Sequence, residues 1–222
     1  MTTPFVIDFV SDIVCPWCVV GLYSLEKALQ DYPGIAVDFR LHPYELDQSS
    51  RREGENMLAH IERKYGIPPE EVRQGLEEIT RRGAEVGFTF NFTDESMTWN
   101  TFDAHRIIHW AKAWGKDLAV KKALFTAYFT ENKNPGDHQL LAGICEKLGL
   151  DHEEALRVLE SGKFTDEVRQ EITLWKSRGV SAVPTIRLQE KQTFTGAQTV
   201  SAFKQAIQSS LEGGYRPGAP LM

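Results

Sequence analysis

The 222-residue chain has few cysteines, no long apolar run and no concentration of basic residues. Its three cysteines, Cys15, Cys18 and Cys145, are too few for the disulfide framework of a small secreted protein. No apolar stretch approaches the roughly 20 residues that span a bilayer. The formal net charge is −6, and the lysines and arginines are scattered, so no basic stripe is present for nucleic acid or anionic lipid. We therefore expect neither nucleic acid nor a membrane as a partner.

The N-terminal residues lack the features of a secretory signal. Met1 to Pro4 lead directly into an apolar segment that contains Asp8, without a positively charged region or a small-residue cleavage site. This pattern predicts a cytoplasmic protein. In such a reducing compartment, a close pair of cysteines is more often catalytic or metal-binding than architectural.

The start of the chain has the pattern of a β-α-β unit. Residues 5–10 are rich in β-branched and aromatic residues, which predicts a buried strand. Apolar residues at helical spacing predict a helix from Pro16 to about Asp31. Residues 36–41 alternate between apolar and polar, which predicts a second strand, parallel to the first.

The middle of the chain carries almost no strand pattern. Apolar residues recur at three-and-four spacing and predict helices over residues 51–65, 69–83, 100–114, 118–131, 137–148 and 151–161. A helix over 165–178, strands over 185–188 and 193–195, and a helix over 199–211 follow. Residues 213–222, with two prolines and three glycines, are expected to form a loose tail. We expect residues 1–43 and 179–212 to form one domain, with a helical domain inserted at 44–164 and the helix 165–178 leading back.

The sequence Cys15-Pro16-Trp17-Cys18 lies where the first strand gives way to the first helix. Placing Cys15 at the N-cap puts Pro16 at the first helical position, where its missing N–H costs nothing. The helix N-terminus would then lower the pKa of Cys15 by roughly one unit and favour the thiolate, which is the attacking form. Cys18 falls on the same face one turn deeper, which suits a resolving thiol. Because neither Pro16 nor Trp17 is cationic, we expect a moderate reduction potential, nearer the reducing or isomerising end of a range of about −120 to −270 mV.

Two other interpretations of the cysteine pair, a metal site and a chemically inert pair, are less favoured. A zinc or iron–sulfur site needs further ligands, and only Cys145 and the helical pair His105 and His109 are available, so a metal is not favoured. An inert pair is also possible, but its position at a strand-to-helix junction is hard to reach by chance. Cys145 lies among apolar residues and is expected to be a buried small hydrophobe. Later in the chain, Pro184 opens a strand and leaves a gap in the hydrogen-bond ladder, so that backbone near Val183 can pair with another group.

These motifs and the order of the elements together resemble the thioredoxin-fold superfamily. Within it, the chain resembles the DsbA-like proteins, which carry a helical domain between the two halves of the fold. It is most similar to the FrnE-type branch in the segments Asp8–Asp12, Asn100-Thr101, Ala104–Arg106, Leu124-Phe125, Ala127–Phe129, Val183–Thr185 and Gly196–Gln198. The resemblance implies an α/β, thioredoxin-like fold with a large all-helical domain inserted between the β-α-β and α-β-β-α halves.

The resemblance also implies an activity, that of a thiol-disulfide oxidoreductase or isomerase. Cys15 would be the nucleophile and Cys18 the resolving thiol, with Pro16 and Trp17 supporting the site. Pro184 would be a cis-proline facing the disulfide, and the Val183 backbone would pair with an extended substrate. The expected substrates are disulfides of proteins or small molecules, with glutathione or a thioredoxin-type protein as reductant and no other cofactor.

Two other functions remain open. Related glutathione-dependent enzymes, the 2-hydroxychromene-2-carboxylate isomerases and kappa-class transferases, usually carry serine at the first cysteine position, so the presence of Cys15 and Cys18 argues against them. A non-enzymatic chaperone or binding module is the other alternative, since a fold does not fix a function.

Overall fold

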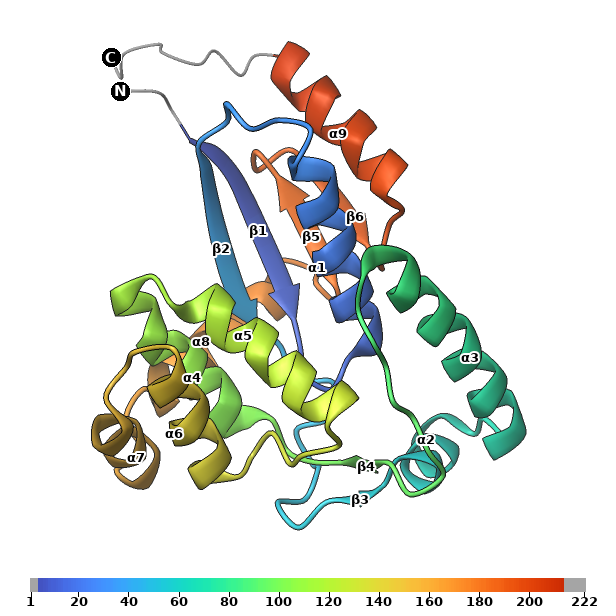
Figure 1. Ribbon diagram of the computed structural model, residues 1–222, viewed down its shortest axis with the longest axis vertical. Coiled ribbons are helices and arrows are strands. Elements are labelled where there is room, and N and C mark those ends of the chain that lie inside the picture. Colours follow the sequence, from blue (N-terminus) through green and yellow to red (C-terminus); the bar gives the residue numbers. More distant parts are fainter. Residues whose placement is uncertain (1–3, 214–222) are drawn as a thin grey trace.

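A four-stranded sheet forms the centre of the computed structural model, which describes residues 4–213 (Figure 1). The strand order is β2-β1-β5-β6, with bounds β1 (Phe5–Ser11), β2 (Val37–Pro43), β5 (Thr185–Leu188) and β6 (Gln192–Thr195). β1 pairs in parallel with β2, as predicted, and antiparallel with β5, which pairs antiparallel with β6. Of the predicted tail, residues 214–222 lie outside the described residues.

β1 is buried on both faces, which explains why its sequence shows an apolar run rather than an alternation. Phe5, Ile7 and Phe9 are fully buried in the main core. Residues of α1 (Pro16–Leu29) and α9 (Val200–Glu212) belong to the same core, and these two helices contact each other. On the opposite face, Val10 packs with Trp175 of α8 (Thr165–Ser177).

A charged network also joins the sheet to α8. Asp8, 2% exposed, accepts hydrogen bonds from Arg187 at 2.8 Å and from His42 at 3.0 Å. The other ring nitrogen of His42 lies 2.6 Å from Glu171 of α8. Burial alone would raise the pKa of Asp8, but the hydrogen bonds from His42 and Arg187 outweigh it and leave the pKa below its usual value. Asp8 therefore stays ionised and links three strands to one helix.

The segment between β2 and β5 is mainly helical, and α4 to α7 group beyond the C-terminal end of β1 (Figure 1). Besides α8, its α-helices are α2 (Met57–Tyr65), α3 (Pro69–Val86), α4 (Phe102–Ala111), α5 (Asp117–Phe125), α6 (His138–Lys147) and α7 (His152–Glu160). A 3₁₀ turn, Lys112–Trp114, follows α4, and a π-helical turn, Thr126–Thr130, follows α5. No helix among residues 4–213 is long and apolar enough to cross a membrane.

One predicted helix begins later than its periodicity suggested. The expected start was Arg51, but α2 starts at Met57, because the Asn56 side chain accepts a hydrogen bond from the Ala59 amide at 3.1 Å and caps the helix. Just before it, β3 (Glu55–Asn56) pairs antiparallel with β4 (Met97–Thr98). This short pair interrupts the helical segment, and two-residue strands are too brief to show an alternation.

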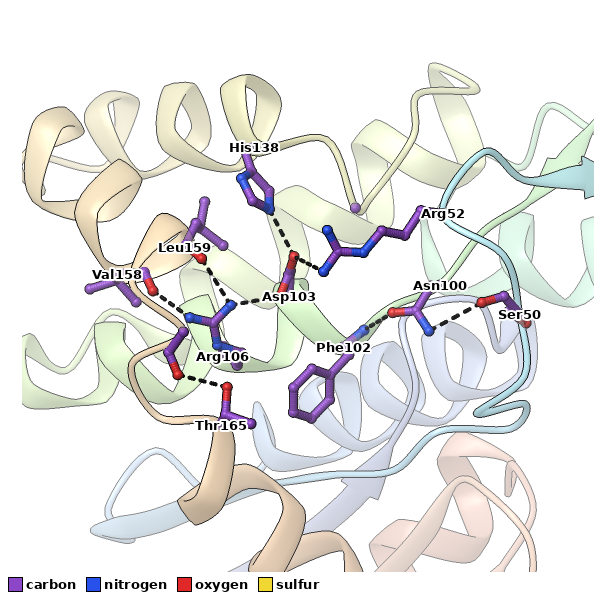
Figure 2. A network of polar contacts seen from close by, with 12 residues as sticks. Ser50, Arg52, Asn100, Phe102, Asp103, Arg106, His138, Val158, Leu159 and Thr165 are labelled. Atoms are coloured by element: carbon purple, nitrogen blue, oxygen red, sulfur yellow. Dashed lines mark hydrogen bonds and ion pairs between the residues drawn. The ribbon is translucent and has the colours of Figure 1, made fainter.

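A buried arginine ties α4 to the turn between α7 and α8 (Figure 2). Arg106 is 3% exposed and donates to the carbonyls of Val158 and Leu159 at the end of α7 and to that of Lys163 in the turn that follows. It also pairs with Asp103 at 2.7 Å, and Asp103 lies 2.8 Å from His138. Burial would raise the pKa of Asp103, but the contacts with His138 and Arg106 hold it below its usual value. Arg106 thus supplies donors to carbonyls that the helix end leaves without intrahelical partners.

Candidate active site

The Cys-Pro-Trp-Cys turn has the predicted position at the start of α1. Cys15 is the N-cap residue, with φ −93° and ψ 107°, and the helix begins at Pro16. The amide of Cys15 donates to the Asp12 carbonyl at 3.4 Å, and the amide of Cys18 donates to the Cys15 carbonyl at 3.0 Å. The turn therefore carries the chain directly from the end of β1 into the helix and places both sulfurs on its first turn.

The two thiols differ in environment, although both are free and both are buried. Cys15 is 4% exposed and Cys18 is fully buried. Cys15 is therefore the more exposed of the two thiols, as predicted, but only by a small margin. Burial raises the pKa of Cys18 well above its usual value, and its contact with Cys15 raises it further. Cys18 therefore remains a thiol at neutral pH unless a neighbouring charge stabilises its thiolate.

The loop before β5 lies beside Cys15. The Val183–Pro184 peptide bond is cis, and the Cys15 thiol donates to the Val183 carbonyl at 3.5 Å. Gly21 of α1 allows this approach, because a Cβ atom added there would lie 3.1 Å from Cγ of Pro184. The pairing of β5 with β1 thus brings together two parts of the chain that are 168 residues apart.

Asp12 holds the turn that precedes Cys15. Its carboxylate accepts from the amides of Ile13 and Leu46, both at 2.7 Å, and lies 3.2 Å from Nε2 of His105 in α4. Burial would raise the pKa of Asp12, but His105 and the backbone donor lower it below the usual value. His105 is thus engaged by a buried carboxylate. Among residues 4–213, no group of three or more His, Cys, Asp or Glu residues is arranged to hold a metal ion.

A buried lysine adds a positive charge beside the thiols. Lys121 of α5 is 1% exposed, and burial lowers its pKa to about 8. The charges of Cys18 and Asp12 act on this pKa in the opposite direction, and the charge of Lys121 in turn lowers the pKa of Cys18. The helical segment therefore supplies a cation to the two thiols.

The sequence comparison decides the family. Residues 6–208 match the family described as the DSBA-like thioredoxin domain. The chain belongs to this family.

Relatives of this DSBA-like protein match over nearly its full length. It is 27% identical over 198 residues to the uncharacterized protein YwbO of Bacillus subtilis, covering 89% of this chain and 92% of that protein. A crystal structure of a probable DsbA oxidoreductase from Streptomyces coelicolor superposes with a TM-score of 0.86 at 28% identity. That match covers 98% of this chain and 94% of the other.

More distant structures share the fold. A 2-hydroxychromene-2-carboxylate isomerase has a TM-score of 0.71 at 20% identity, covering 94% and 97% of the two chains. The cytosolic disulfide reductase DsbM from Pseudomonas aeruginosa, determined with glutathione, has a TM-score of 0.63 at 15% identity, covering 93% and 99%. The predicted α/β, thioredoxin-like fold with a helical insertion is confirmed.

The structure of this DSBA-like chain brings the six predicted site residues together. Cys15, Cys18, Val183 and Pro184 meet at the start of α1, and Pro16 and Trp17 form its first turn. The third cysteine, Cys145, lies apart in α6, as expected for a small hydrophobe. It is fully buried, and burial raises its pKa to about 12.

The role of Lys121 beside the DSBA-like site was not predicted from the sequence. The signal that could have identified it is its phase, since Lys121 lies three and four residues before Leu124 and Phe125, which are fully buried. A lysine on the apolar face of a helix is rare, because burial of an ammonium group is unfavourable. The identity of its partners still required the fold, since they come from a distant part of the chain.

Proposed function

We propose that this DSBA-like protein is a thiol-disulfide oxidoreductase that uses Cys15 and Cys18 on disulfides of proteins or small molecules. The observation that carries the proposal is the position of Cys15, at the N-cap of α1 and 3.5 Å from the Val183 carbonyl in the cis-proline loop. This position places the sulfur at the N-terminus of a helix and beside the loop along which an incoming segment would lie. Cys18, fully buried one turn further on, suits the second step.

The proposed reaction has two exchange steps. The Cys15 thiolate attacks one sulfur of the substrate disulfide, the substrate S–S bond breaks, and the leaving thiolate takes up a proton from solvent. Cys18 then loses its proton and attacks Cys15 in the mixed disulfide, which forms the Cys15–Cys18 disulfide and releases the second substrate thiol. The substrate gains two electrons and the enzyme loses two. Two molecules of glutathione, or one thioredoxin-type dithiol, return the enzyme to the dithiol form.

The proposal also includes the direction of electron flow and the cellular compartment. A pair that rests reduced would act as a reductase or isomerase in the cytoplasm, in line with the uncharged Pro16-Trp17 dipeptide and the FrnE-type resemblance. The glutathione-bound DsbM supports glutathione as a reductant for this fold.

Turnover and a reduction potential test this function together. We expect the purified protein to catalyse dithiothreitol-driven reduction of insulin and reactivation of scrambled ribonuclease. Equilibration with glutathione buffers, followed by alkylation of free thiols, should give a potential nearer about −270 than about −120 mV. Absence of turnover with every disulfide tried would refute the proposal, and a potential near −120 mV would instead indicate an oxidant.

A glutathione-dependent isomerase or transferase is the main alternative. The 2-hydroxychromene-2-carboxylate isomerase shares the fold, but at 20% identity the likeness concerns the fold alone. An assay of glutathione conjugation and of isomerisation separates the two functions, because that chemistry needs no second thiol. Full activity of a Cys15→Ser, Cys18→Ser double variant in such an assay, or as a chaperone, would favour the corresponding alternative.

We predict that Lys121→Met slows the second exchange step without destabilising the fold. Loss of its positive charge should raise the pKa of Cys18 further and slow resolution of the mixed disulfide about tenfold at pH 7. The difference should shrink as the pH rises through about 8, where Lys121 in the parent protein loses its own charge. Stopped-flow measurement of mixed-disulfide resolution against pH provides the readout.

Lys121→Met should increase the free energy of unfolding, although it slows the second exchange step. The folded pKa of Lys121, about 8, lies below the ordinary 10.5, so the buried ammonium costs about 3 kcal/mol below pH 8, and this cost fades as the pH rises towards 10.5. The Lys121→Met substitution would remove that cost. Lys122→Met is the matched control, since Lys122 pairs instead with Glu26 at 2.8 Å. Equal rates of resolution for the two variants would contradict the role of Lys121.

A further inference from the structure

Asp12 connects three separate segments of the chain just before the Cys-Pro-Trp-Cys turn. It directly follows β1 and is 1% exposed. Its Oδ1 atom accepts a hydrogen bond from the Ile13 amide at 2.7 Å and lies 3.2 Å from Nε2 of His105 in α4. Its Oδ2 atom accepts from the amide of Leu46, which lies beyond β2, at 2.7 Å. The carboxylate therefore joins its own loop to the end of β2 and to the inserted helices.

The backbone of Asp12 reaches both cysteines. Its carbonyl accepts from the Cys15 amide at 3.4 Å, a long hydrogen bond that holds the turn only weakly by itself. Burial raises the pKa of Cys18, and a hydrogen bond from the Asp12 backbone acts in the opposite direction, because a donor facing the sulfur favours the thiolate. The hydrogen bonds of the Asp12 side chain thus fix a stretch of backbone that serves both cysteines.

The charge of Asp12 also acts on Lys121. Burial lowers the pKa of Lys121 to about 8, and the charges of Cys18 and Asp12 act against this lowering. Since the charge of Lys121 lowers the pKa of Cys18, Asp12 influences Cys18 by two routes, through its backbone and through Lys121. The other titratable groups that act on Asp12 or Lys121 are Cys15, Tyr44, Glu45, His105, Asp117 and Tyr128.

Stability alone does not account for the contact between His105 and Asp12. Both side chains are 1% exposed, and burial of two such groups removes their hydration. Apolar residues of similar size often give an equal or greater free energy of unfolding at such positions. The two residues are 93 positions apart and join an inserted helix to the loop before the cysteines. The place of this contact in the molecule therefore suits a role in the chemistry.

We infer that Asp12 and His105 are positioning residues for the second exchange step, in which Cys18 attacks the mixed disulfide on Cys15. This inference rests on the proposed function and concerns the same site. His105 holds the Asp12 carboxylate, the carboxylate holds the loop, and the Asp12 backbone donates to the Cys18 sulfur as its negative charge develops. The first step depends less on this contact, because the Cys15 sulfur lies at the N-terminus of α1.

Three substitutions isolate this contact. His105→Leu removes a donor from Asp12, whereas His105→Gln keeps an N–H donor on a side chain of similar reach. Asp12→Asn keeps the size of the side chain. Each carboxylate oxygen accepts from a backbone amide, so the NH₂ group of asparagine would face a donor in either orientation.

The matched control removes a similar contact elsewhere in the helical segment. Nε2 of His138 in α6 lies 2.8 Å from the carboxylate of Asp103 in α4, and Figure 2 shows this pair beside Arg106. His138→Leu therefore removes a histidine–aspartate contact that is not part of the Cys-Pro-Trp-Cys turn. Circular dichroism establishes that each variant is folded under the assay conditions.

The test mixes the reduced protein with one equivalent of the aryl disulfide dithiobis(nitrobenzoate). Attack by Cys15 breaks the aryl S–S bond, releases one coloured thiolate and leaves the mixed disulfide; attack by Cys18 releases the second and forms the Cys15–Cys18 disulfide. His105→Leu and Asp12→Asn should slow the second release about tenfold at pH 7, the effect of weakening one hydrogen bond to a charged sulfur, and should change the first by less than about threefold. His105→Gln should recover most of the parent rate, and His138→Leu should leave both rates unchanged.

The pH dependence of the second release is a readout that a merely structural role would not move. Because the negative charge of Asp12 raises the pKa of Lys121, its removal in Asp12→Asn should lower that pKa below about 8. The pH at which Lys121 loses its charge, identified as the part of the profile that Lys121→Met abolishes, should therefore fall in Asp12→Asn.

The outcomes separate this inference from the function on which it rests. Equal rates of the second release in the parent protein and in His105→Leu would overturn the inference and leave the oxidoreductase function intact. Equal slowing of both releases, or a second release as slow in His105→Gln as in His105→Leu, would also overturn it. If Asp12→Asn does not fold, the two His105 variants decide the question. Absence of a second release in the parent protein would refute the function itself.

Discussion

Cys15→Ser is expected to lower disulfide reduction by about a thousandfold or more, because a serine hydroxyl at neutral pH is a far weaker nucleophile than a thiolate. The structure gives no substitute, since Cys18 is fully buried and its pKa is raised by burial. Insulin reduction at pH 7 is a suitable measurement. The fold should survive, because the exchange of sulfur for oxygen at the N-cap places a favourable capping residue there.

Cys18→Ser should fail at a different step. Cys15 can still attack, but nothing resolves the product, so the variant should accumulate a mixed disulfide with its substrate, detectable by mass spectrometry of the intact adduct. Cys145→Ser is the control and should retain activity, since Cys145 is fully buried in α6. Accumulation of the adduct in Cys15→Ser instead of Cys18→Ser would reverse the assigned roles.

Arg106→Leu is expected to cost about 3–5 kcal/mol of unfolding free energy, the usual effect of removing one partner from a buried ion pair. The substitution leaves the carbonyls of Val158, Leu159 and Lys163 without their donor and leaves Asp103 with His138 as its close partner (Figure 2). Urea unfolding followed by circular dichroism would measure the loss.

The control for Arg106 lies on α7. Arg157 is exposed and pairs with Glu154 at 2.8 Å, so Arg157→Leu should leave the unfolding free energy almost unchanged. The pKa of Asp103 is lowered in the fold, so its ion pair stabilises the protein above the unfolded pKa of about 3.9 and is lost as the pH falls. The gap between the parent protein and Arg106→Leu should therefore narrow at acid pH. Equal losses in the two variants would rule out a special role for Arg106.

The features predicted correctly from the sequence are those with local causes. The apolar run of β1 and the proline at the first position of α1 fixed the placement of Cys15, because strand burial and helix starts follow rules that act over a few residues.

The remaining features depend on contacts between distant residues. β3 and β4 pair across about 40 residues of chain and are too short for a pattern. α2 starts at Met57 rather than near Arg51 for a local reason instead, because the hydrogen bond that caps the helix at Asn56 prevails over apolar spacing. The effect of Lys121 on the two thiols depends on α5 lying near the Cys-Pro-Trp-Cys turn, and the cavity lined by Trp17, α2 and α3 exists only between packed helices.

The approach of Val183 to Cys15 has a consequence for the order of synthesis. A ribosome delivers β1 and both thiols early, but β5, which completes the neighbour of β1 and brings the cis-proline loop, comes near the end of the chain. Until then, one edge of β1 lacks its partner and the thiols lack the cover of Val183. Contacts so distant in sequence form slowly, so we expect nascent chains that end before β5 to depend on chaperones and to be vulnerable to thiol oxidation.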